Sequence, residues 1–281
     1  MRILLFMLIL LPLLGKAQEA SLFKIVSQHG AVLLDGDSTH CGQAVTSKNQ
    51  KLEISGSGSY VIVLTEAGYA FKLKRGEYTT ERIFKTKRSN LMEIKKDQRE
   101  REAPVREQVD DITVMNIDNE YADALNNSLT LIWKSRKPVE SGYTVHIVSV
   151  LDELLYDSIV NSNVLTIDVS QAFKTESAVL FDIRTKNSSS HQHLIKKISD
   201  QDKRNAMQDF DCVSEMESNE NTLLLLALCE VHNLYYDQIH YLYTLWQQEK
   251  ESGVKINHPY YQRLLREYDF ESYFKPVSKS N

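Results

Sequence analysis

Short apolar runs separated by glycines characterise residues 22–80. Seven of the ten glycines lie between Gly30 and Gly76. Glycine tolerates the conformations that connect short strands, and Asp35-Gly36 is typical of a tight hairpin turn. The pattern predicts a small β-domain over residues 19–82, with strands at residues 22–26, 31–34, 51–54, 60–64 and 70–73 and a second hairpin turn at residues 66–68.

A second group of β-type runs lies in residues 111–186. These runs are rich in β-branched and aromatic residues, and their regular spacing is typical of a β-sandwich. Trp133 lies on the first run, and we expect it in the core because a large aromatic residue there usually fills the space between two sheets. The predicted strands are residues 129–133, 143–148, 164–169 and 179–184.

Helical periodicity begins at about residue 194. Residues 223–228 are apolar on all sides, as expected for a helix buried between neighbours. A stripe with helical spacing follows, and a last helix opens at Asn257 and Pro259. The sequence therefore predicts an α-helical module over residues 194–275, in which two helices meet at a turn near Asn233. The stripe consists of Tyr235, Ile239, Leu242 and Trp246.

Two polar segments separate these regions. Residues 81–107 contain nine Lys or Arg and six Asp or Glu residues, and such mixed charge suits a solvated linker or helix. We assign a charged linker to residues 83–110 and a serine-rich linker to residues 187–193. The predicted fold class is multidomain α+β, with two all-β, sandwich-like domains followed by an α-helical module.

Residues 1–17 have the layout of a secretory signal peptide. Arg2 precedes an apolar run over residues 3–14, and Gly15 and Ala17 are small residues before a cut at Gln18. This run is too short for the hydrocarbon core of a membrane, which needs about 20 residues. We expect an exported protein, periplasmic or extracellular, with no transmembrane span in the mature chain.

Charge and cysteine content limit the classes of partner and scaffold. The net charge of −5 argues against nucleic acid, whose binders usually carry a basic excess. Three cysteines are too few for a disulfide scaffold. Cys212 and Cys229, on consecutive predicted helices, are the expected pair if a bridge forms, whereas the alternative that we favour makes both buried free thiols.

The N-terminal region resembles the small β-domain of FecR-like proteins. Three segments carry the resemblance, and they match the family in the order of strands and turns. FecR-like regulators cross the inner membrane, and because this sequence has no such span, their signalling role is not carried over. The segments are Gly30-Ala31-Val32, Gly42-Gln43-Ala44-Val45 and Leu73-Lys74-Arg75-Gly76-Glu77-Tyr78.

The other two regions resemble known modules as well. Trp133 on one strand, followed by the strand Tyr143-Thr-Val-His-Ile, is similar to a fibronectin type III or immunoglobulin-like domain. Residues 219–252 have the length and helix–turn–helix order of one tetratricopeptide repeat. Leu225 fits the pattern of that repeat, whereas Leu226, Gln238 and Lys250 depart from it. A single repeat lacks the neighbours that form the peptide-binding groove of longer arrays.

No catalytic, cofactor or metal site is predicted. Cys229 and His232 lie three residues apart, but the apolar run before Cys229 favours burial over a reactive thiol. His191 and His193 lack further ligands and are interpreted as part of a linker. Aromatic residues are the positive signal, because eight of the fourteen tyrosines lie between Tyr235 and Tyr273.

These observations favour binding over catalysis. Tyrosine is enriched at interfaces, so we select Tyr236, Tyr241, Tyr243 and Tyr260 as candidate partner contacts. The predicted function is a non-enzymatic adaptor or scaffold of the cell envelope, which binds a protein partner through its helical end. The alternatives are binding of glycan or peptidoglycan by the β-domains and an envelope enzyme.

Overall fold

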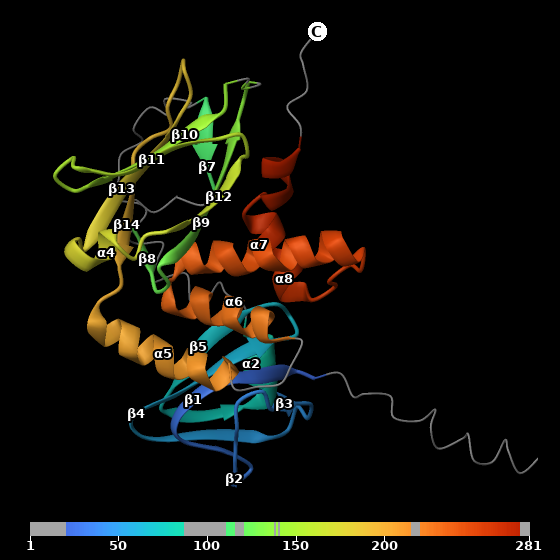
Figure 1. The fold of residues 1–281 in the computed structure, drawn as a ribbon. Coiled ribbons are helices and arrows are strands. Elements are labelled where there is room, and N and C mark those ends of the chain that lie inside the picture. Colours follow the sequence, from blue (N-terminus) through green and yellow to red (C-terminus); the bar gives the residue numbers. More distant parts are fainter. Residues whose placement is uncertain are drawn as a thin grey trace, which may run out of the picture.

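The computed structural model describes residues 21–86, 111–115, 121–137, 139, 141–214 and 220–275. These residues form a mixed α+β structure in which helices lie between two β regions (Figure 1). The expected signal peptide at residues 1–17 lies outside the described residues. So does most of the expected charged linker, although residues 83–85 belong to helix α2.

The N-terminal β region is one sheet followed by a short helix. Its strand order is β2-β1-β4-β5, with β3 paired to β1 and β6 paired to β4. The sequence correctly predicts the turns at residues 35–36 and 66–68. The elements are β1 (Phe23–Leu34), β2 (Asp37–Ser38), β3 (Ala44–Val45), β4 (Lys51–Thr65), β5 (Ala70–Lys74), β6 (Gly76–Thr79) and α2 (Thr80–Lys85).

Strands β1 and β4 are longer than predicted, because each contains two of the expected strands. Their pairing shifts register between His29 and Ala31, where residues 56–59 bulge out of β4. Gly30 has a φ of 81°, and a Cβ there would collide with Ser59. The glycine therefore forms a bulge within a continuous strand and not the expected turn.

The second β region contains two sheets, with strand orders β11-β10-β13-β14-β8 and β12-β9-β7. Both sheets contribute to one hydrophobic cluster, in which Trp133 is fully buried as predicted. The elements are β7 (Ile112–Val114), β8 (Tyr121–Ala124), β9 (Ser128–Ser135), β10 (Tyr143–Ser149), β11 (Leu154–Val160), β12 (Val164–Asp168), α4 (Ala172–Thr175), β13 (Ala178–Arg184) and β14 (His193–Lys197).

Two strands of this region correct the sequence analysis. The serine-rich linker at 187–193 and a helical region from 194 were expected, but residues 193–197 form β14, which pairs with β13 and β8. Strand β11 was not predicted either. It lies at the edge of its sheet with much of its surface exposed, so its sequence lacks the alternation of a half-buried strand.

The helices follow at the C-terminal side. As predicted, two of them meet at Asn233, which ends the first in the left-handed conformation with a φ of 58°. Another begins at Pro259, one residue after His258, whose side chain accepts a hydrogen bond from the backbone of Tyr260. The elements are α5 (Asp200–Ser214), α6 (Asn221–His232), α7 (Tyr235–Ser252), α8 (Pro259–Glu267) and the 3₁₀ helix η2 (Phe270–Phe274).

These helices form a layer between the β regions (Figure 1). Helices α5 and α6 contact β1, while α7 contacts β8 and β9. Val26, Ile62 and Leu64 of the N-terminal sheet belong to the same hydrophobic cluster as the helices. Tyr236 of α7 belongs instead to the cluster between the two sheets of the second β region. The helical residues are therefore a shared core rather than a separate end of the molecule.

A disulfide joins Cys41 and Cys212, whose Cα atoms are 6.3 Å apart. The sequence-based pairing of Cys212 with Cys229 is therefore wrong, as is the favoured alternative that Cys212 is free. Cys229 is a buried free thiol. The bridge links the segment after β2 to α5, two elements 171 residues apart in sequence that packing brings together.

Candidate functional site

The four tyrosines selected from the sequence do not form one exposed surface. Tyr236 is 2% exposed and Tyr260 is 0% exposed. Tyr236 packs edge-on against Phe181, with ring centroids 6.3 Å apart. The Tyr260 hydroxyl donates to the carbonyl of Leu226 at 3.1 Å. The expectation that these two tyrosines contact a partner is wrong, because Tyr236 packs into the second β region and Tyr260 packs into the helical cluster.

Tyr241 and Tyr243 are half-buried against the helical core. Burial raises the pKa of Tyr241 to about 12. The ring of Tyr243 stacks with Trp246 and Phe274, at centroid distances of 6.1 Å and 6.0 Å. Both tyrosines therefore pack against the helical core. A candidate binding surface has to lie on other elements.

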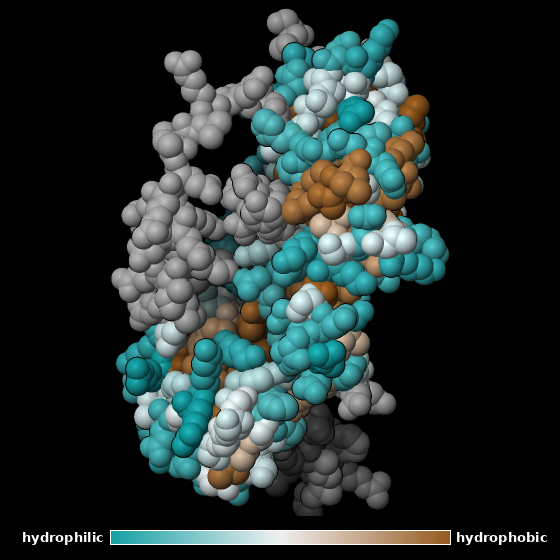
Figure 2. All heavy atoms as spheres, turned by 90° about the vertical axis from the view of Figure 1, so that its left-hand side faces the viewer, coloured by the Kyte–Doolittle hydropathy of each residue, from teal (hydrophilic) through white to brown (hydrophobic). Residues whose placement is uncertain are grey.

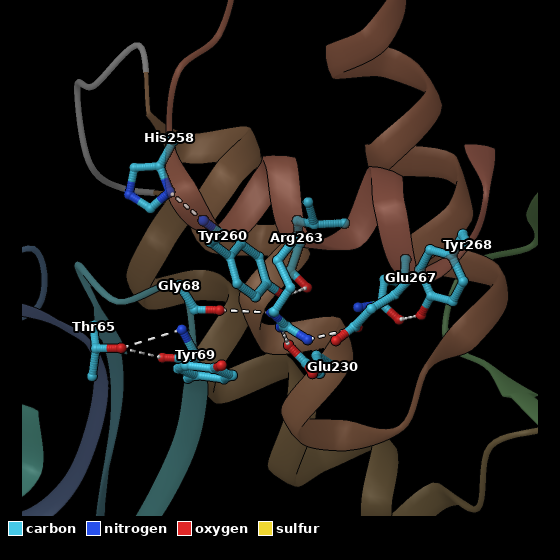
Figure 3. A network of polar contacts seen from close by, with 11 residues as sticks. Thr65, Gly68, Tyr69, Glu230, His258, Tyr260, Arg263, Glu267 and Tyr268 are labelled. Atoms are coloured by element: carbon cyan, nitrogen blue, oxygen red, sulfur yellow. Dashed lines mark hydrogen bonds and ion pairs between the residues drawn. The ribbon is translucent and has the colours of Figure 1, made fainter. Parts of the chain in front are cut away.

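Arg263 connects the helices to the N-terminal sheet (Figure 3). Its guanidinium donates to the Gly68 carbonyl, to Glu230 of α6 and to Glu267 of α8, each at 2.7 Å. It also lies 5.1 Å from the ring of Tyr260. Arg263 is buried and its charge is compensated by two carboxylates, so the junction avoids the cost of an unpaired buried charge.

Asp237 makes the corresponding connection to the second β region. Its carboxylate accepts hydrogen bonds from the backbone N–H of Leu125 at 2.8 Å and of Asn126 at 3.0 Å, and from the Asn126 side chain at 2.6 Å. Burial raises the pKa of Asp237 to about 6, although these hydrogen bonds favour the charged form. Asp237 thus fixes α7 against the turn before β9.

A third buried charged side chain, Asp209, lies between α5, α6 and the N-terminal sheet. It accepts hydrogen bonds from Ser27, from the Tyr60 hydroxyl at 3.1 Å and from His232 Nε2 at 2.8 Å. Ser27 is buried and binds the carboxylate, not the imidazole. A serine nucleophile requires its hydroxyl to contact the base, so this arrangement fits a structural junction.

Cys229 and His232 are not arranged as a nucleophile and its base. Burial raises the pKa of the Cys229 thiol well above its ordinary value, which disfavours the reactive thiolate. The Nε2 atom of His232 is engaged by Asp209. The interpretation of Cys229 as a buried thiol agrees with its position in the helical core.

Exposed apolar side chains are concentrated on the hairpin formed by β10 and β11. Leu151 is 82% exposed, Leu154 60% and Ile159 70%. A brown apolar patch in the upper part of Figure 2 lies on the side toward which this hairpin projects in Figure 1. We define the hairpin patch as Val150, Leu151, Leu154, Leu155 and Ile159.

The backbone of the hairpin is well defined by hydrogen bonds. Ser149 Oγ accepts from the N–H groups of Leu151 and Glu153, both at 3.1 Å. Asp152 has a φ of 64°, a conformation that aspartate tolerates in turns. Strand β11 pairs with β10 alone among the strands of the described residues, so none of these strands pairs with its other edge.

Acidic residues surround the hairpin patch. Asp152 and Glu153 are exposed in the turn, and Asp157 of β11 lies 3.8 Å from His146 Nδ1 of β10. The segment Leu151-Asp-Glu-Leu-Leu-Tyr-Asp-Ser-Ile159 therefore combines exposed apolar groups with negative charge. Sequence reasoning missed it. The available signal was this mixture of leucine and acid between two predicted strands.

Several features bear on the class of protein. Among the described residues, no group of three or more His, Cys, Asp or Glu side chains could hold a metal ion. No helix in the described ranges is both long and apolar enough to cross a membrane. No protein-family model and no curated protein matches the chain.

Proposed function

We propose that the protein is an exported, non-enzymatic adaptor that binds an extended segment of a protein partner along β11. The observation that carries the proposal is the hairpin patch on an edge strand. Apolar side chains at such exposure are expected at protein interfaces. An open strand edge binds extended segments through backbone hydrogen bonds, while side-chain contacts give specificity.

The charge of the hairpin favours a partner of a different sequence over a second copy of this chain. Pairing all of Leu154–Val160 with an identical antiparallel strand would place Asp157 opposite Asp157 of the copy. Like charges directly opposite each other destabilise a strand pair. A partner strand with apolar residues and a Lys or Arg opposite Asp157 complements the hairpin.

The arrangement of the chain supports a role as a scaffold. The helical layer shares hydrophobic clusters with both β regions and so holds the hairpin in a fixed position relative to the N-terminal sheet. The Cys41–Cys212 disulfide supports an oxidising compartment, which agrees with the proposed export. The hairpin replaces the tyrosines of the helical end as the proposed contact.

We also propose that the β regions are a FecR-like and a fibronectin- or immunoglobulin-like domain, and that α6 and α7 form one tetratricopeptide-like unit. The facing strand sets support the second assignment. Strands β7, β9 and β12 lie opposite β10, β13 and β14, which resembles the two sheets of an immunoglobulin-like sandwich.

The test is capture of the partner from the native cell envelope by the full chain without its predicted signal peptide. Leu151→Asp/Leu154→Asp should retain the fold, because both side chains are largely exposed, and should lose the partner by about tenfold or more, as expected when central apolar contacts are removed. Val254→Asp is the matched control, since Val254 is 68% exposed and lies two residues beyond the end of α7.

Charge provides a second readout once the partner segment is identified. A synthetic peptide of that segment should bind Asp157→Lys about tenfold more weakly than Asp157→Asn, because lysine repels the cation of the partner whereas asparagine is neutral. Equal capture by the wild type and the double-leucine variant would sink the proposal. So would a wild-type dimer that Leu151→Asp/Leu154→Asp converts to a monomer, because the occupant of the edge would then be a second copy.

A further inference from the structure

A pocket in the N-terminal sheet is lined by cationic side chains. Its volume is about 670 Å³, within the range of about 300 to 1,000 Å³ typical of small-molecule sites. Lys72 and Lys74 of β5 contribute to one wall together with Arg75, while Asn205 and Gln208 of α5 contribute to another. The remaining lining residues are His29, Gly58, Ser59 and Tyr60.

Among the residues that the structure describes, no carboxylate lines this pocket. Lys74 and Arg75 are exposed, and neither forms an ion pair within 4.0 Å with any residue in the described part of the chain. Asp209, whose charge acts on Lys72, is buried and hydrogen-bonded to the Tyr60 hydroxyl. Within the described part of the chain, the positive charge of the pocket is therefore not compensated at its surface.

Lys72 is held in place at the inner part of this cationic group. Its Nζ atom lies 3.3 Å from the centroid of the Tyr60 ring, and His29 stacks on the same ring at 5.6 Å. Burial lowers the pKa of Lys72, while the charge of Asp209 opposes this effect. An anion in the pocket would stabilise the charged ammonium group.

The rim of the pocket contains the glycine- and serine-rich bulge of β4. Gly58 has a φ of 76°, and Gly58 and Ser59 both line the pocket. Residues 56–59 have no partner in β1. The bulge supplies small residues, a serine hydroxyl and backbone groups outside the strand ladder, which are suited to close approach by a ligand.

A second pocket of similar size also contains cationic side chains, but there the charge of a lysine is partly compensated by the protein. It has a volume of about 710 Å³ and contains Lys134 and Arg136. There, Lys134 is 3.5 Å from Asp269 and donates to Ser272 at 2.8 Å. Its charge is partly compensated within the protein, unlike that of Lys74 and Arg75.

We propose that the pocket between β5, the β4 bulge and α5 binds a small anionic molecule through a phosphate group. Lys72, Lys74 and Arg75 supply charge, and the Asn205 and Gln208 amides are available as hydrogen-bond donors. The site is independent of the hairpin patch, which lies in the other β region. Phosphate is present in soluble metabolites and in lipid headgroups, and the experiment separates these sources.

The test uses the full chain without its predicted signal peptide and three probes. Inorganic phosphate and glycerol 3-phosphate are titrated by NMR, and vesicles with or without phosphatidylglycerol are tested by co-sedimentation. Lys74→Gln/Arg75→Gln should weaken phosphate binding by about tenfold or more, the loss expected for a charge-assisted hydrogen bond. Arg136→Gln, an exposed cation at the second pocket, should bind as the wild type does.

Lys74 and Arg75 are exposed, so their replacement should leave the fold intact, and circular dichroism checks this. A loss of binding in the variant can therefore be assigned to the pocket. Saturable shifts with glycerol 3-phosphate identify a soluble ligand, while binding to phosphatidylglycerol vesicles alone identifies a lipid headgroup. Absence of saturable binding to all three probes overturns the proposal. Equal binding by Lys74→Gln/Arg75→Gln and the wild type overturns it as well.

Discussion

Three buried charged side chains lie where separate parts of the chain meet. Asp209 joins α5 to the N-terminal sheet, Arg263 joins α8 to the β4–β5 turn, and Asp237 joins α7 to the second β region. A buried charge without partners would cost several kcal/mol. Each of these three has partners from other elements, and the partners determine how the elements are oriented.

Asp237 should make stability depend on pH. Burial raises the pKa of the Asp237 carboxyl in the folded state to about 6, from an ordinary value of 3.8. The folded state therefore binds the proton more tightly than the unfolded state does. The resulting stabilisation of the fold is present below about pH 4 and is lost as the pH rises through 6. Relative to Asp237→Asn, the wild type should lose up to about 3 kcal/mol between pH 4 and pH 7. Urea unfolding of both proteins measures this, and parallel pH profiles would contradict it.

At the scale of elements, α5 is attached to the N-terminal side of the molecule by a covalent bridge and by a buried carboxylate. The disulfide from Cys212 reaches Cys41, and Asp209 on the same helix binds Ser27 and Tyr60. The two attachments lie one helical turn apart, since Asp209 and Cys212 are three residues apart. Together they fix which face of α5 contacts the sheet.

Breaking this disulfide should destabilise the protein. The bridge closes a loop with a sequence separation of 171 residues, and we expect its loss in Cys41→Ser/Cys212→Ser to lower the free energy of unfolding by roughly 2 to 5 kcal/mol. Denaturant unfolding with and without reductant measures the effect. The double variant is its own control, because reductant should leave its stability unchanged.

At the scale of the molecule, both β regions depend on the helical layer for part of their cover. Val26, Ile62 and Leu64 of the N-terminal sheet pack into the helical cluster, and Tyr236 of α7 packs into the second β region. Shared hydrophobic clusters favour one cooperative unit over independent domains.

A fragment limited to residues 18–199 should therefore expose apolar surface. It retains both β regions but loses the helices that cover Val26, Ile62 and Leu64. At about 25 cal/mol per Å² of apolar surface, we expect a loss of several kcal/mol, with binding of a hydrophobic dye. Unfolding of the full chain should be a single transition. Separate transitions in the full chain, together with a stable fragment that does not bind dye, would contradict this prediction.

Local sequence patterns were sufficient for much of the secondary structure. The runs at residues 129–133 and 143–148 lie within β9 and β10, and the turn at Asn233 separates α6 and α7. The local patterns failed where exposure removed the periodic signal, as in β11, or where a glycine formed a bulge, as at Gly30. The prediction that Tyr236 and Tyr260 contact a partner failed for a different reason. Composition cannot show which side of a helix another element covers.

The sequence by itself determined the alternation of β and helical segments, the burial of Trp133 and the positions of the main turns. The patterns that predict these properties can be read from residues that are close along the chain. Only the tertiary structure decided that Cys41 pairs with Cys212, that Tyr236 and Tyr260 are core residues, and where the hairpin patch and the cationic pocket lie. Each of these depends on how the elements pack against one another. Periodicity indicates that a face is buried, but it does not indicate which element buries it.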